Sequence, residues 1–259
     1  MGYADVLKRI EAALEAAQEA LQDFTSGRIQ AALKDGGDPV TEADTRLDSI
    51  LKSRLLRSGE GWLSEETQDD RSRLKQNCVW IVDPLDGTRE FIQGIPEWCI
   101  SIAYVVDGCP QAAGICNPAA GQTFLGVRGQ GITLNGKPAA VSQKQDLNGA
   151  AVSASRSEVN RGQWKPFENA PFRIIPMGSV AYKLARVAAG LEDMTFTLVA
   201  KNEWDVAAGW LLVEAAGGII LDKNRRIRRF NQPNPLLDGL FAGNAAILQH
   251  LFNTTLQQQ

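Results

Sequence analysis

Two aspartates, Asp83 and Asp86, end an apolar run in the stretch VWIVDPLDGTREF, residues 79–91. The run predicts a buried strand that ends at Asp83, after which Pro84 and Gly87 force the chain to turn. The turn places the two carboxylates side by side, where they repel each other unless a cation lies between them. Oxygen ligands without histidine or cysteine favour Mg²⁺ or Mn²⁺ over zinc. We therefore predict a divalent metal site at this turn.

The residues that follow the turn predict a phosphate site. Thr88 opens a short predicted helix that continues through REFI. The first backbone N–H groups of a helix commonly bind phosphate, so those of Gly87 and Thr88 are candidates. A metal ion and a phosphate group would then meet at one turn.

Other carboxylates have ordinary structural explanations when each is taken alone. Glu65 and Glu66 follow an apolar step in WLSEET, and adjacent glutamates are usually solvated. Asp205 opens an apolar helix in NEWDVAAGW, where an N-cap or first-turn carboxylate is favoured. Asp44 closes the tetrapeptide TEAD, which fits a helix capping box. Spacing alone therefore assigns no catalytic role to these residues.

Composition narrows the classes of function. The chain has 259 residues, of which 44% are hydrophobic and 22% charged, as in an ordinary soluble globular protein. No apolar run approaches the roughly 20 residues of a membrane-spanning helix, and the N-terminus lacks a signal-peptide pattern, so we expect a cytoplasmic protein that does not bind membranes. The net charge of −3 gives no reason to expect nucleic acid as a partner.

Histidine and cysteine chemistry is largely excluded. The single histidine, His250, lies in a helix-like tail, so every Ser-His-Asp or Cys-His mechanism would depend on it. The four cysteines form no C-x-x-C pair and are predicted to be buried thiols. Hydrolysis would run more readily on carboxylates and a metal ion.

Hydrophobic periodicity predicts two lobes. Helical spacing marks residues 4–25 and a second helix that begins at the TEAD cap. Short strands from 79 to 141 form an antiparallel meander, and strands then alternate with helices. We predict an N-terminal α+β lobe over residues 1–145 that carries the metal loop. A C-terminal α/β lobe over residues 146–259 would complete the substrate cleft.

The motifs together match one family. They are, in order, the pair Glu65-Glu66, the stretch DPLDGT from Asp83 to Thr88, and WDVAA from Trp204 to Ala208. The chain resembles the lithium-sensitive, metal-dependent phosphatases of the inositol monophosphatase superfamily, whose hallmark is Glu-Glu, then D-P-[IL]-D-[GS]-T, then W-D-x-A-A. The resemblance covers nearly the whole chain. It implies a layered α/β (α+β) sugar-phosphatase fold, like that of inositol monophosphatases and fructose-1,6-bisphosphatases, with alternating helix and sheet layers.

The resemblance also implies roles for individual residues. Two or three Mg²⁺ ions, with Mn²⁺ as a substitute, would be bound by Glu65, Asp83, Asp86, Asp205 and the carbonyl oxygen of Leu85. The catalytic group would be Asp44, Glu65 and Thr88, with Thr88 and Asp44 orienting and helping to deprotonate a water for in-line attack on phosphorus. Li⁺ would inhibit the reaction, and a homodimer is compatible with the resemblance.

Two positions favour one branch of the superfamily. The stretch DGTREF, with Arg89 and Glu90, looks like the D-G-T-[KR]-E-F of CysQ-type 3′(2′),5′-bisphosphate nucleotidases, whereas inositol monophosphatases typically read D-G-T-x-N-F. Leu198 stands where inositol monophosphatases usually carry an acidic residue that contacts ring hydroxyls. An apolar side chain cannot form that hydrogen bond.

Substrate contacts are predicted from segments similar to those of the nucleotidases. They are Asp86, Gly87, Thr88, Ser155, Arg156, Gly178, Ser179, Lys183 and Asp205. The members from Ser155 to Lys183 would bind a second phosphate or the ribose, although Lys183 is equally well explained as a solvated helix charge. Arg229, in a run of arginines, is a weaker candidate for a nucleotide phosphate, because such runs are usually hydrated surface.

The sequence therefore predicts a Mg²⁺-dependent phosphomonoesterase that acts on a small phosphate ester. Its most favoured reaction is removal of the 3′-phosphate of 3′-phosphoadenosine 5′-phosphate to give AMP. The alternative on the same scaffold is an inositol-1-monophosphatase or a broad sugar-phosphate phosphatase. An alternative of another class is an RNA- or protein-binding regulator that acts through residues 225–229.

Overall fold

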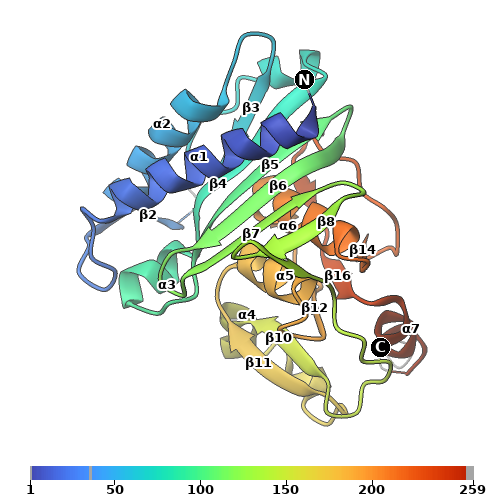
Figure 1. The fold of residues 1–259 in the computed structure, drawn as a ribbon. Coiled ribbons are helices and arrows are strands. Elements are labelled where there is room, and N and C mark those ends of the chain that lie inside the picture. Colours follow the sequence, from blue (N-terminus) through green and yellow to red (C-terminus); the bar gives the residue numbers. More distant parts are fainter. Residues whose placement is uncertain (1, 35–36, 255–259) are drawn as a thin grey trace.

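The structure is a computed structural model that describes residues 2–34 and 37–254. Helices and sheets alternate in layers (Figure 1). Helices α1 (Tyr3–Leu21) and α2 (Glu42–Leu55) cover one face of a seven-stranded sheet. Helices α5 (Val180–Ala188) and α6 (Glu203–Ala215) lie between this sheet and a five-stranded sheet, whose outer face carries α4 (Arg156–Asn160) and α7 (Ala245–Thr254). The predicted layered α/β fold is confirmed.

The seven-stranded sheet follows chain order. Its strands are β3 (Gly61–Ser64), β4 (Cys78–Asp86), β5 (Cys99–Val106), β6 (Cys109–Asn117), β7 (Gln122–Val127), β8 (Gly131–Leu134) and β9 (Lys137–Ala139). From β4 to β9 they form the predicted antiparallel meander. Strand β3, which the sequence did not reveal, runs parallel to β4 and pairs Ser64 with Val82. This pairing places Glu65, the residue after β3, beside the end of β4.

The second sheet has the order β11-β10-β12-β16-β14. Its strands are β10 (Ala151–Ser155), β11 (Arg173–Met177), β12 (Met194–Thr197), β14 (Ile219–Asp222) and β16 (Leu240–Gly243). Two small sheets pair β1 (Ala31–Leu33) with β2 (Pro39–Thr41) and β13 (Lys201–Asn202) with β15 (Leu236–Leu237). The short helices are α3 (Thr88–Gln93), η1 (Ser72–Lys75) and η2 (Lys165–Phe167).

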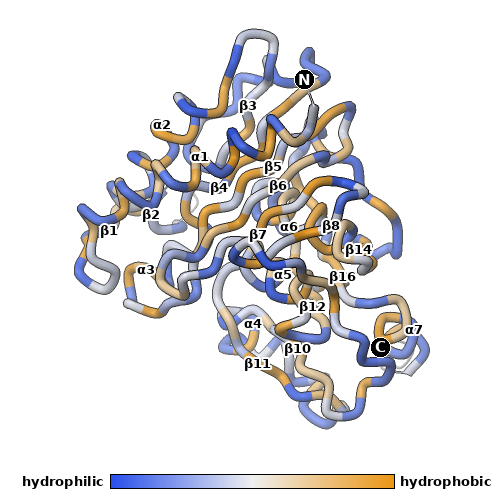
Figure 2. Tube along the Cα trace, in the orientation of Figure 1, coloured by the Kyte–Doolittle hydropathy of each residue, from blue (hydrophilic) through white to orange (hydrophobic). Residues whose placement is uncertain are grey.

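Strand β4 reads as a continuous apolar run because both of its faces are covered. Ile81 packs into the core shared with α5 and α6, whereas Trp80 and Val82 face the core under α1 and α2. Alternation disappears from a strand that is buried on both sides. Figure 2 shows the hydrophobic residues concentrated along the central strands and α6 and the hydrophilic ones along the outer loops.

Two details differ from or go beyond the expectations. Helix α1 ends at Leu21 instead of continuing to residue 25, and Phe24 packs against the same core from the following turn. The lobe division at residues 1–145 and 146–259 stays a prediction. Within the described ranges, no helix combines the length and the apolar character needed to cross a membrane.

Candidate active site

A cavity of about 260 Å³ lies where the end of β4 meets α5, β13 and the start of α6. It gathers most of the predicted site residues: Glu65, Leu85, Asp86, Gly87, Thr88, Ser155, Arg156, Gly178, Ser179, Lys183 and Asp205. The two remaining ones, Asp44 and Asp83, do not line the cavity and are each only 1% exposed. Segments far apart in the sequence thus contribute to one site.

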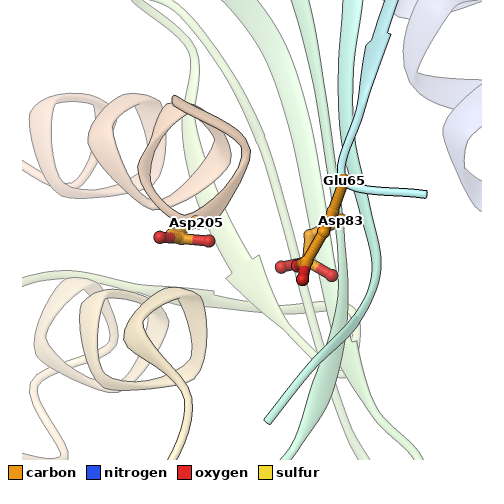
Figure 3. A group of neighbouring side chains, drawn as sticks. All are labelled: Glu65, Asp83 and Asp205. Carbon is orange, nitrogen blue, oxygen red and sulfur yellow. The ribbon is translucent and has the colours of Figure 1, made fainter. Parts of the chain in front are cut away.

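Glu65, Asp83 and Asp205 form an acidic centre whose carboxylate oxygens lie within 4.8 Å of one another. Figure 3 shows Asp205, from the first turn of α6, facing Glu65 and Asp83 across a gap. The backbone N–H of Asn202 donates to Asp205 Oδ2 at 2.9 Å in a capping box, which fixes this side chain. Asp205 is therefore both a helix cap and a member of the acidic centre.

Within the described residues no ion pair reaches Asp83 or Asp205, whereas Glu65 is paired with Lys34. Burial, reinforced by neighbouring carboxylates, raises the pKa of Asp83 and of Asp205 well above the usual range. The backbone N–H of Leu85 donates to Asp83 Oδ1 at 3.0 Å, but Asp83 Oδ2 is buried without a hydrogen-bond partner. An unsatisfied carboxylate oxygen among further carboxylates fits a hard divalent cation such as Mg²⁺ or Mn²⁺.

Asp86 is not one of the three carboxylates of the acidic centre and is held by hydrogen bonds from the start of α5. Its Oδ2 accepts hydrogen bonds from Ser179 Oγ at 2.7 Å and from the backbone N–H of Ala181 at 2.6 Å. Ser179 Oγ also accepts from the Tyr182 N–H at the start of α5. Burial raises the pKa of Asp86, and these hydrogen bonds, with Lys183, partly offset it. Its Oδ1 remains available to a ligand.

Thr88 and Asp44 are in direct contact, as expected. Thr88 Oγ1 lies 2.9 Å from Asp44 Oδ1 and 3.1 Å from the carbonyl oxygen of Leu85. The other Asp44 oxygen, Oδ2, accepts from the backbone and side chain of Thr41 in the predicted capping box. Asp44 therefore caps α2 with one oxygen and contacts Thr88 with the other.

Gly87 is required by the geometry of the turn. Its φ of 101° is a conformation that other residues rarely adopt, and an added Cβ would lie 2.9 Å from the carbonyl oxygen of Glu97. The tight turn allows Asp86 and Thr88 to face the cavity from adjacent positions.

Arg156 is already paired with acids. Its NH2 lies 2.5 Å from Glu97 Oε2, and its Nε lies 3.9 Å from Glu90 Oε1. Glu97 Oε2 also accepts from the backbone N–H of Gly178, and Glu90 packs where a Cβ of Gly178 would stand. Glu90, the glutamate of DGTREF, thus packs against the GS turn, which is formed by Gly178 and Ser179. Ser155 lies beside this group, with its Oγ 3.0 Å from Ser157 Oγ.

Lys183 is buried, so its interpretation as a solvated helix charge is wrong. It is only 5% exposed, and its Nζ donates to the carbonyl oxygens of Ser179, Gly178 and Met177 at 2.6, 3.3 and 3.4 Å. Burial lowers the pKa of Lys183 to about 8. The lysine lines the cavity from the first turns of α5.

The suggestion that Arg229 reaches a nucleotide phosphate is wrong. Its guanidinium contacts the carbonyl oxygen of Asp107, at the β5–β6 turn, and Arg229 is not part of the cavity lining. The path of the connection between β14 and β15 decides where Arg229 points, and nothing in the local sequence specifies that path. Leu198 is 44% exposed and precedes the lining residue Ala200 by two positions.

Two lysines at the site were missed. Lys34 Nζ lies 2.6 Å from both Glu65 and Glu66, and burial raises the pKa of Glu66 to about 7 although Lys34 opposes the change. Lys201 lines the cavity and lies 2.9 Å from Glu158 Oε1. Of the two, only Lys201 could have been noticed from the sequence, because it lies three residues before Trp204 in the motif KNEWD.

Comparisons with known proteins agree with this fold. A profile of the Inositol monophosphatase family matches residues 3–259. The chain is 34% identical over 223 residues to an inositol-1-monophosphatase of Mesorhizobium japonicum (82% of this chain, 83% of the relative). It is 37% identical over 226 residues to the Nus factor SuhB of Xylella fastidiosa (83% and 80%).

A crystal structure of CysQ from Bacteroides thetaiotaomicron, a bacterial member of the same family, matches with a TM-score of 0.76 at 23% identity, over 92% of this chain and 96% of that one. At this identity the likeness bears on the fold alone. The chain belongs to the inositol monophosphatase family and is a phosphatase of that family.

Proposed function

We propose that the chain is a Mg²⁺-dependent phosphomonoesterase that removes the 3′-phosphate of 3′-phosphoadenosine 5′-phosphate, giving AMP and phosphate. The observation that carries the proposal is one cavity with two kinds of wall. The acidic wall contains Glu65 and Asp205 with the buried Asp83 beside them, and within the described residues no ion pair reaches either aspartate; the basic wall contains Arg156, Lys183 and Lys201. A cation can satisfy the first wall while a substrate with more than one anionic group approaches the second.

The acidic centre would hold two or three metal ions. Glu65, Asp83 and Asp205 are the first ligands, with Asp86 and the carbonyl oxygen of Leu85 as further ones. The bound ions would neutralise the phosphate charge, activate the attacking water and stabilise the leaving alkoxide. Carboxylates with raised pKa values become good ligands when a cation favours their charged form.

Thr88 and Asp44 would move the proton of the attacking water. Thr88 Oγ1 can accept a proton from the water while its own proton passes to Asp44 Oδ1, 2.9 Å away. The backbone N–H groups of Gly87 and Thr88 would hold the phosphate oxygens for in-line attack. No covalent enzyme intermediate is required.

The choice of substrate rests on the second wall and on Leu198. Inositol 1-phosphate needs hydrogen-bonding groups for its ring hydroxyls, and Leu198 offers none. The second candidate, an inositol-1-monophosphatase or broad sugar-phosphate phosphatase, is favoured by the names of relatives such as the Mesorhizobium inositol-1-monophosphatase. The regulator hypothesis is supported by the name of the SuhB relative, but residues 225–229 do not line the cavity.

The test is phosphate release with Mg²⁺ from 3′-phosphoadenosine 5′-phosphate and from inositol 1-phosphate at equal concentrations, with and without Li⁺. The proposal predicts higher kcat/KM for the nucleotide and inhibition by Li⁺. Preference for inositol 1-phosphate would favour the second candidate, and no release from either would contradict both.

A further inference from the structure

Lys201 lies on β13, four residues before Asp205, and its side chain reaches the cavity. Strand β13 pairs Lys201 with Leu237 of β15, so the backbone at this position is fixed. The side chain is 13% exposed, which leaves the ammonium accessible to a ligand in the cavity and largely shielded from bulk water. A charge in such a place interacts more strongly with an anion than a solvated one does.

The ammonium group has donors to spare. Lysine carries three N–H donors, and within the described residues only Glu158 Oε1 lies at bonding distance, 2.9 Å from Lys201 Nζ. Glu158 is itself 2% exposed and is fixed by Thr197 Oγ1 at 2.7 Å and Trp164 Nε1 at 3.3 Å. The fixed side chain of Glu158 therefore positions Lys201. The remaining N–H groups of Lys201 can donate to a ligand.

The other cations lining the cavity are either held by several partners or more exposed than Lys201, within the part of the chain that the structure describes. Arg156 contacts two glutamates, and Arg89 is paired with Asp38 at 2.9 Å. Lys183 donates to three backbone carbonyl oxygens. Lys201 thus combines a single acceptor with a largely buried position, whereas the side chain of Arg89 is 57% exposed and Arg156 contacts two glutamates.

Lys201 also lies near two of the carboxylates that would bind the metal ions, Asp86 and Asp205. Burial raises the pKa values of Asp86 and Asp205, and the charge of Lys201 is among the influences that lower them. The ammonium and these carboxylates therefore share the same space. A phosphate bound at the acidic centre would leave a second phosphate of a small substrate within the field of Lys201.

We infer that Lys201 is a specificity-determining residue that binds the second phosphate of a bisphosphate substrate, with Glu158 as its positioning partner. The inference rests on the proposed phosphomonoesterase function and adds the residue that selects for a second anionic group. A nucleoside bisphosphate and a sugar bisphosphate share this chemistry. A substrate with a single phosphate would gain nothing from Lys201.

The experiment compares kcat/KM within two matched pairs of substrates. One pair is 3′-phosphoadenosine 5′-phosphate and adenosine 3′-monophosphate, and the other is fructose 1,6-bisphosphate and fructose 1-phosphate. We expect Lys201→Met to lower the bisphosphate-to-monophosphate ratio about 10- to 100-fold, mainly through KM, as expected for loss of a charge-assisted hydrogen bond. Lys201→Arg should retain most of the ratio.

Matched variants separate specificity from damage to the fold. Lys223→Met removes a lysine that is 43% exposed and lies outside the cavity, and it should leave the ratio unchanged. Because Lys201→Met leaves Glu158 without its cationic partner, the double variant Lys201→Met/Glu158→Gln is measured as well, and the same loss is expected.

The outcomes are distinct. A wild-type preference for a bisphosphate that survives in Lys201→Met and in Lys201→Met/Glu158→Gln overturns the inference and leaves the proposed function standing. A preference confined to the fructose pair and lost with Lys201 supports the inference but contradicts the nucleotide assignment. A wild-type enzyme without preference in either pair overturns the inference, and activity on neither bisphosphate contradicts the proposed function as well.

Discussion

The two walls of the cavity solve opposite electrostatic problems. Beside the acidic wall, Asp83 keeps a buried oxygen without a partner, and burial raises its pKa and that of Asp205. On the basic wall, Arg156 is paired with glutamates and Lys183 donates hydrogen bonds to backbone carbonyl oxygens. The acidic wall is therefore incomplete without a cation from outside, whereas Arg156 and Lys183 on the basic wall already have partners within the chain.

This difference assigns separate tasks to the two walls. Uncompensated buried carboxylates cost stability, and such groups cluster where chemistry is done. Paired cations hold their positions and add selectivity at little cost. Changes on the acidic wall should therefore abolish turnover, and changes on the basic wall should alter KM and substrate choice.

The largest effect should follow Asp86→Asn. The asparagine oxygen can still accept from Ser179 Oγ and the Ala181 N–H, so the fold should persist while the charge is lost. We expect kcat to fall at least about 1,000-fold, as for loss of a group that acts in the transition state. Phosphate release and thermal unfolding measure the two effects. Asp238→Asn, at a carboxylate 63% exposed, is the control, and retained activity in Asp86→Asn would contradict the metal-site assignment.

Thr88→Val should have the next largest effect. The substitution preserves shape but removes the hydroxyl that contacts Asp44 at 2.9 Å. We expect kcat to fall about 100-fold with little change in KM, the usual size of a lost proton-transfer group. Thr88→Ser restores the hydroxyl and should recover most of the rate. Equal losses in both variants would show that packing, and not proton transfer, explains the effect.

The acidic wall was predictable because its residues sit in continuous motifs. DPLDGT places Asp83, Asp86 and Thr88 on one turn, and WDVAA places Asp205 on the first turn of a helix. The sequence also gave the order of most strands and helices. It missed β3, whose parallel pairing with β4 positions Glu65, because a four-residue strand carries little local signal.

The basic wall was predicted only in part. Arg156 and Lys183 were identified, but their partners Glu97 and the carbonyl groups of the GS turn come from tertiary packing. Lys201 was not singled out, because its cationic role depends on where β13 lies relative to α4. The prediction for Arg229 failed for the same reason, since the path of a long connection decides which arginine faces which cavity.

Lys183 should give KM a pH dependence. Because its pKa is lowered to about 8, the lysine loses its charge as the pH rises through that value. We expect KM for an anionic substrate to rise about 5-fold between about pH 8 and about pH 9, where the charged fraction falls steeply, with kcat less affected. Steady-state kinetics over this range measures it. Lys183→Arg, which keeps its charge, should show a flatter profile; an equally steep rise would exclude Lys183 as its source.

The smallest effect concerns the stability of the metal-free protein. Asp83 and Asp205 have raised pKa values in the folded state, so the folded protein binds protons that the unfolded chain has released. Their contribution to the free energy of unfolding therefore decreases as the pH rises from about 4 towards neutrality. Thermal unfolding in a chelator should show Tm falling by a few degrees more in the wild type than in Asp83→Asn between about pH 5 and about pH 7.5. Identical pH profiles would contradict the raised pKa of Asp83.

The most direct test of the account is whether the acidic centre binds the cation. Mn²⁺ can be titrated into the protein and its free concentration followed by electron paramagnetic resonance, with the wild type and Asp83→Asn compared and Mg²⁺ used as a competitor. The account predicts saturable Mn²⁺ binding by the wild type, displaced by Mg²⁺, and at least about 10-fold weaker binding by the variant. Equal affinity of the two proteins, or no binding by the wild type, would contradict it.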